Sequence, residues 1–137
     1  MNKIMKLKIF EIRKLANKKE YKKALNVLDT VDIHKVKASN DLSLIAFIYE
    51  QNKNYMDAKN ILLEIYRKNK TKRAIYYLIN IFIKMKYIDE AEKYFNDFLT
   101  IAPKDTDRFV LRYKLDKAKN KSFDDLIIDL EELKAHD

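Results

Sequence analysis

The feature that most restricts the fold is the absence of glycine: none occurs among the 137 residues, and Pro103 is the only proline. Tight hairpin turns and strand bulges usually rely on glycine to reach positive φ, so a sheet protein is disfavoured. Glycine-rich phosphate loops, dinucleotide-binding fingerprints and nucleophile elbows cannot form without it. The sequence therefore predicts an all-α fold with polar turns, and it excludes several large enzyme classes.

Apolar residues recur at helical spacing along most of the chain. The clearest runs are Leu42, Ile45, Ile48 and Tyr49, then Ala58, Ile61, Leu62, Ile65 and Tyr66, and then Ile75, Leu78, Ile79 and Phe82. Short polar breaks separate helical segments at residues 17–19, 51–54 and 119–122. Asparagine tolerates the left-handed backbone that ends a helix, so we expect asparagines in these breaks to replace the missing glycines.

A motif also recurs at a much longer interval. A small or apolar residue stands at intervals of 34, 33 and 35 residues, at Ala24, Ala58, Ala91 and Leu126. Large apolar residues follow four positions later, at Leu28, Leu62, Phe95 and Leu130. A small side chain lets two antiparallel helices cross closely, and large neighbours fill the space beside the crossing. The period therefore predicts stacked helix pairs.

A helix pair that repeats about every 34 residues resembles the tetratricopeptide repeat. The match is most specific over residues 39–105, where the third unit places the expected residue types at Ile75, Leu78, Phe82, Ala91, Phe95 and Pro103. The resemblance implies one domain over residues 1–137, a right-handed α-solenoid of about four helix pairs. The expected repeats cover approximately residues 5–38, 39–71, 72–105 and 106–137.

The first and last repeats depart from this pattern. Lys8 and Glu11 stand where apolar residues are expected, as in an N-terminal cap with a solvated face. In the fourth repeat, Lys114 and Lys117 fall at expected core positions. A shift of one residue in that helix places a different set inward, namely Leu111, Leu115 and Ala118.

Proteins of this family expose a concave groove, and the resemblance implies which residues line it here. The implied groove residues are Phe47, Glu50, Arg73, Tyr76, Tyr77, Asn80, Arg108 and Arg112. Tyrosine offers rigid apolar area with a polar tip, and arginine offers a fork suited to carboxylates. We expect a non-catalytic module that binds a peptide or protein surface with an acidic group. The alternative is a solvated face with one tyrosine packed on the neighbouring repeat.

The resemblance also argues against one known kind of partner. Some members bind acidic C-terminal tails through a carboxylate clamp of basic and asparagine residues. Ser43 and Phe47 stand where that clamp has lysine and asparagine, and Tyr77 replaces a further asparagine. We therefore do not expect chaperone-tail recognition of that kind.

Charge supplies two further hypotheses. Residues 1–40 carry a net charge of +7, while residues 105–137 carry −2. Lysines around the expected first turn could contact nucleic-acid phosphates, at Lys14, Lys18, Lys19, Lys22 and Lys23. Self-association through exposed end repeats is the other alternative, and it would make the chain a structural scaffold.

Few residues suit catalysis or metal binding. Cysteine is absent, and neither His34 nor His136 has metal-like spacing, so we expect no metal and no cofactor. The pairs at residues 89–90 and 124–125 are acidic, and we interpret each as a helix start, where carboxylates favour the positive end of the helix dipole. No signal peptide or membrane span is evident, so we expect a cytoplasmic protein.

Overall fold

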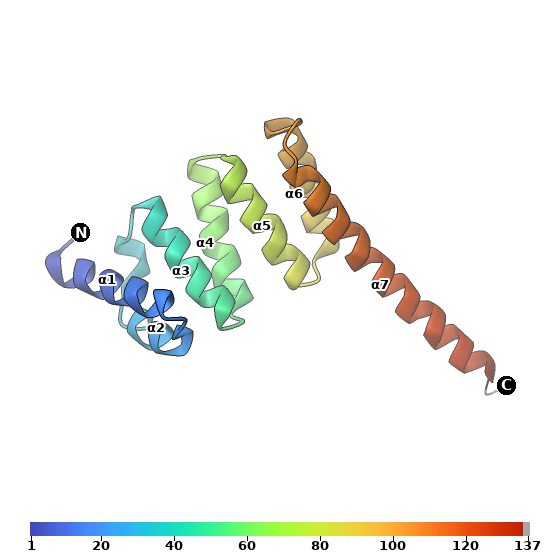
Figure 1. The fold of residues 1–137 in the computed structure, drawn as a ribbon, viewed down its shortest axis with the longest axis horizontal. Coiled ribbons are helices and arrows are strands. Elements are labelled where there is room, and N and C mark those ends of the chain that lie inside the picture. The colour runs from blue at the N-terminus through green and yellow to red at the C-terminus, as the bar shows by residue number, and fades with distance from the viewer. Residues whose placement is uncertain (136–137) are drawn as a thin grey trace. The chain divides into compact units, whose positions relative to one another are not determined.

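The computed structural model describes the backbone of residues 1–135 and the side chains of residues 1–120 and 131. Over these residues the fold is all-α and contains no β-strand. The α-helices are α1 (Lys3–Asn17), α2 (Tyr21–Leu28), α3 (Ser39–Gln51), α4 (Tyr55–Lys68), α5 (Lys72–Lys84), α6 (Ile88–Ile101) and α7 (Asp107–Ala135), with a short 3-10 helix, η1, at Ile33–Lys35 (Figure 1). The chain divides into two compact units, Met1–Ala74 and Ile75–Asp137.

In the first unit, α1 packs against α2 and α3 packs against α4, with a further contact between α2 and α3. Ala24 and Ala58 are fully buried, which confirms the predicted close crossings. The predicted apolar run of α4 is buried throughout, and three of the four predicted residues of α3 are buried as well. In α1, the residues that turn inward are Met5, Ile9 and Ile12, so Lys8 and Glu11 stay outside the core.

Three turns share one backbone geometry. Lys19, Lys53 and Lys86 have φ of 59°, 62° and 64°, at intervals of 34 and 33 residues. In the first turn, the N–H of Glu20 donates to the carbonyl of Leu15 at 2.9 Å, and the later turns repeat this bond with Asn54 to Tyr49 and Tyr87 to Phe82. This pattern is the Schellman motif of helix C-termini.

Lysine, rather than asparagine, occupies the left-handed position in each of these turns. The expectation that asparagine would do so is therefore wrong. Asn52 precedes the left-handed residue, with φ of −93°. Its side-chain amide instead donates to the carbonyl oxygens of Tyr21 at 3.0 Å and Ile48 at 2.8 Å, which ties α2 to the end of α3.

The second unit contains α6, α7 and most of α5. The predicted core of α5 is buried at Ile75, Leu78, Ile79 and Phe82. On α6, Ala91 is fully buried, with Phe95 and Phe98 buried beside it. On α7, Leu111 and Leu115 are fully buried while Lys114 is half-buried, which confirms the shifted register for this helix.

The predicted break at residues 119–122 does not form. Instead α7 runs without interruption for 29 residues, and Figure 1 shows it continuing past the end of α6. Asp124 and Asp125 therefore lie inside a helix, and the prediction that they begin one is wrong. The segment carries lysine and asparagine, as the turns at Lys19 and Lys53 do, so its residue types do not account for the difference.

Candidate peptide-binding face

Three polar or aromatic residues share the side of α5 that faces away from its buried core. Tyr76 and Asn80 are half-buried, and Tyr77 is 42% exposed. The rings of Tyr76 and Tyr77 meet edge to face, with centroids 5.9 Å apart. The amide nitrogen of Asn80 donates to the backbone carbonyl of Tyr76 at 2.9 Å. This bond fixes which way the amide points and leaves its oxygen available to accept.

Lys114 of α7 supplies a positive charge to this cluster. Its Nζ donates to Oδ1 of Asn80 at 2.8 Å and lies 5.8 Å from the ring centroid of Tyr76. Sequence reasoning noted Lys114 only as an anomaly at an expected core position. Lys114 follows Asn80 by 34 residues. This spacing equals the repeat period, so the two residues occupy equivalent positions in neighbouring predicted repeats, and the period could have indicated their proximity. The three side chains form what we call the Lys114 cluster: Tyr76, Asn80 and Lys114.

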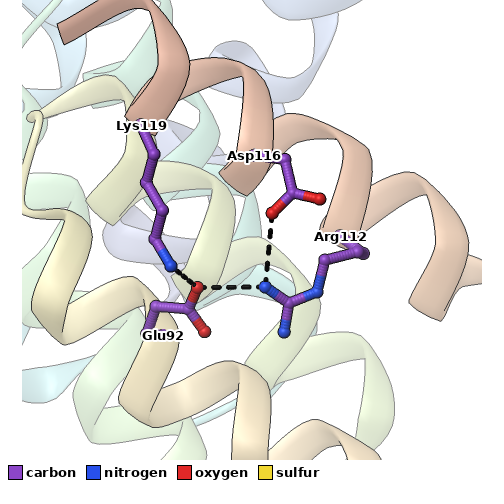
Figure 2. Close-up of polar contacts among 4 residues, drawn as sticks. All are labelled: Glu92, Arg112, Asp116 and Lys119. Carbon is purple, nitrogen blue, oxygen red and sulfur yellow. Dashed lines mark hydrogen bonds and ion pairs between the residues drawn. The ribbon is translucent and has the colours of Figure 1, made fainter. Parts of the chain in front are cut away.

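Arg112, the arginine expected beside Tyr76 and Asn80, instead contacts α6. Its guanidinium is 3.0 Å from Oε1 of Glu92 and 3.5 Å from Oδ1 of Asp116. Figure 2 shows both contacts as dashed lines. It also lies 4.5 Å over the ring of Phe95. Lys119 reaches the same carboxylate from the next turns of α7. This network joins α6 to α7, and the charge of Arg112 is paired with carboxylates of the same chain.

Glu92 is the anionic centre of that network. Partial burial acts to raise the pKa of its carboxyl group. Hydrogen bonds from Lys119 and Arg112, together with their positive charges, outweigh this effect, so the pKa of Glu92 lies below its ordinary value. The ionised form of Glu92 therefore contributes to the packing of α7 on α6.

The remaining predicted groove residues are spread over both units. Phe47 and Glu50 lie on α3 in the first unit; Phe47 is 39% exposed and its ring meets that of Tyr21 edge to face, with centroids 5.6 Å apart. Arg73 is exposed in the first turn of α5. Arg108 contacts the carbonyl of Pro103 and lies 4.5 Å over the ring of Phe109. Of the predicted set, the contacts above bring together Tyr76, Tyr77 and Asn80.

The other residues considered for chemistry have simple placements. Asp89 and Glu90 lie in the first turn of α6, which confirms their interpretation as a helix start. His34 is exposed in η1, and His136 lies outside the described residues. Within the described part of the chain, no three His, Cys, Asp or Glu residues gather in a way that would hold a metal ion. No helix described here is long and apolar enough to cross a membrane.

The chemistry of the Lys114 cluster suits recognition of an anion next to an apolar group. An ammonium has three N–H donors, and one of them is directed to Asn80. A carboxylate beside Lys114 would gain a charge-assisted hydrogen bond. The partly exposed ring of Tyr77, which meets the ring of Tyr76, offers apolar contact surface on the same side of α5. Neither a protein-family model nor a curated protein matches this chain.

Proposed function

We propose that this protein is a non-catalytic interaction module of the tetratricopeptide type, which binds a peptide or protein segment carrying an acidic group. The observation that carries the proposal is Lys114, whose ammonium lies between Oδ1 of Asn80 and the ring of Tyr76. A cation oriented by two neighbours loses less freedom when it binds a carboxylate than a free lysine does. Tyrosine beside a positive charge is typical of binding hot spots.

The repeat architecture is part of the same proposal. Its support is the reuse of one turn at Lys19, Lys53 and Lys86, with a fully buried alanine five residues later each time, at Ala24, Ala58 and Ala91. On this proposal the chain is one domain, a right-handed solenoid of helix pairs. On the same proposal the protein acts in the cytoplasm.

The test begins with capture of partners from the native cell by the immobilised full chain, followed by their identification. Lys114→Met removes the charge but keeps most of the side-chain stem. Lys93→Met is the matched control, since Lys93 also lies over a tyrosine ring, 6.0 Å from that of Tyr94. We expect Lys114→Met to lose a partner that Lys93→Met retains, with circular dichroism unchanged. Equal capture by both variants would overturn the proposal.

Nucleic-acid association through the first unit is a second candidate. The lysines around the α1–α2 turn are all exposed, at Lys14, Lys18, Lys19, Lys22 and Lys23. Contacts to phosphates weaken steeply as salt is added, since they release condensed counterions. Titration with a generic duplex and a single strand at low salt therefore tests it, and lack of binding under those conditions removes this candidate.

A further inference from the structure

The first helix, α1, has two apolar faces. One is buried in the first unit and forms part of its core. The other is exposed to solvent: Ile4 is 68% exposed, Leu7 is 59% exposed and Phe10 is 66% exposed. Their spacing of three residues places them on successive turns of one side of α1, and we call these three residues the α1 row. A helix on the surface of a domain needs only one apolar face to pack, and a continuous second one is typical of an interaction surface.

Exposed lysines adjoin the α1 row. They lie beside it and continue its side of the helix towards the C-terminus, at Lys3, Lys6, Lys14 and Lys18. Within the described residues, none of these four ammonium groups takes part in an ion pair or a hydrogen bond. The other two basic residues of α1 are engaged: Nζ of Lys8 donates to the carbonyl of Thr30 at 3.0 Å. Arg13 lies 3.1 Å from Oδ1 of Asp41. The four lysines near the row are therefore available to an external anion.

The charge of this part of the chain restricts the kind of partner. Residues 1–23 contain nine basic and two acidic residues, a net charge of +7. Glu11 is the only acidic residue of α1, and it lies between Leu7 and Lys14 on the exposed side. A second copy of α1 would bring two strongly positive surfaces together, and like charges repel. The partner that complements the α1 row is therefore both anionic and apolar.

A membrane surface with anionic lipids has both properties. Interfacial helices carry large apolar residues on one side with lysines beside them, and they lie in the plane of the interface without crossing the membrane. The lysine stem is long enough for its ammonium to reach a headgroup while neighbouring apolar side chains enter the bilayer. A nucleic acid would supply phosphates, but the aliphatic Ile4 and Leu7 cannot stack on its bases. An acidic protein would need a groove shaped to the convex side of α1, whereas a deformable bilayer needs none.

We infer that α1 is an interfacial helix that binds the surface of membranes containing anionic lipids. The α1 row enters the boundary between headgroups and acyl chains, and the lysines beside it contact the headgroups. The first unit keeps its fold on the membrane, because the core residues of α1 lie on its other face. The contact does not use the Lys114 cluster, which belongs to the second unit, so the two sites can be tested separately.

Vesicle flotation with the full chain tests the inference. We expect the wild type to float with vesicles of equal parts phosphatidylcholine and phosphatidylserine, and far less with phosphatidylcholine alone. Phe10→Gln should weaken binding at least about tenfold, whereas the matched control Phe109→Gln, at a residue 62% exposed on α7, should not change it. Lys6→Gln should weaken binding about fivefold, and Lys70→Gln, which removes the same charge from an exposed loop, should have little effect. No binding to the anionic vesicles, or equal losses from the α1 variants and their controls, would overturn the inference.

Fluorescence tests whether the α1 row enters the bilayer. The chain has no tryptophan, so Phe10→Trp introduces a single reporter, and Phe109→Trp is its control. With the anionic vesicles, we expect the emission of Phe10→Trp to shift to shorter wavelength and that of Phe109→Trp to stay unchanged. Binding without this shift would show that the lysines alone hold the headgroups. Capture of an acidic protein through the row, with no vesicle binding, would show a protein site instead. Either result contradicts the inference.

Discussion

Replacing Lys53 with glycine should make the protein more stable. Lys53 has φ of 62°, and the left-handed region costs a residue with a Cβ about 1–2 kcal/mol. Glycine avoids this cost but gains freedom in the unfolded chain, which offsets about 0.4–1 kcal/mol of the benefit. The net expectation is an increase of roughly 0.5–1 kcal/mol in the free energy of unfolding for Lys53→Gly. The equivalent changes at Lys19 and Lys86 should act alike, because their φ angles match.

The assay is equilibrium urea unfolding followed by circular dichroism, with the midpoint compared at constant slope. Lys59→Gly, inside α4, is the control, and it should lose about 0.7–1 kcal/mol because glycine is a poor helix former. Lys121→Gly should also lower helix content, since this lysine lies inside α7. A neutral or destabilising Lys53→Gly would refute the strained-turn reasoning. Stabilisation by Lys121→Gly would indicate a turn in α7 and contradict the continuous helix.

Two further predictions concern α6. Ala91→Leu should lower the free energy of unfolding by about 1–3 kcal/mol, because Ala91 is fully buried and a larger side chain would overpack its surroundings. Asn96→Leu, on the exposed face of α6, should change it by less than about 0.5 kcal/mol. Equal effects of the two substitutions in urea unfolding would contradict close packing at Ala91. The pKa of Glu92 is lowered in the folded protein. The ionised carboxylate therefore stabilises the fold fully at pH values above the ordinary carboxyl pKa, and this stabilisation is lost as the pH falls through the pKa of Glu92 in the folded protein. The stability difference between the wild type and Glu92→Gln should therefore shrink below about pH 4.5, and a difference that stays constant down to about pH 3 would contradict the role of the ion pairs.

The core of each helix pair could be predicted from the sequence because it depends on local spacing and on small residues at regular intervals. Ala24, Ala58 and Ala91 are fully buried, as their spacing predicts. The residue type in the turns could not be predicted in the same way. Without glycine, some residue must take the left-handed position, and the backbone bonds of the Schellman motif select it by its place after the helix rather than by propensity.

The repeat period did not predict that the last helix is continuous. The break at residues 119–122 carries the same kinds of residue as the other turns, yet α7 stays continuous. The sequence also predicted the candidate site only in part. The resemblance pointed to Tyr76, Tyr77 and Asn80, but the cation that contacts Tyr76 and Asn80 is Lys114 rather than Arg112. Ion pairing with Glu92 across α6 and α7 decided where Arg112 points.

The central claim is that the Lys114 cluster binds an acidic segment, and affinity measurement tests it most directly. A captured partner would be reduced to a synthetic peptide, and its dissociation constant measured by titration calorimetry for the wild type, Lys114→Met and Lys93→Met. Loss of a charge-assisted hydrogen bond predicts about tenfold to hundredfold weaker binding for Lys114→Met, and unchanged binding for Lys93→Met. Equal affinity for all three proteins would contradict the account.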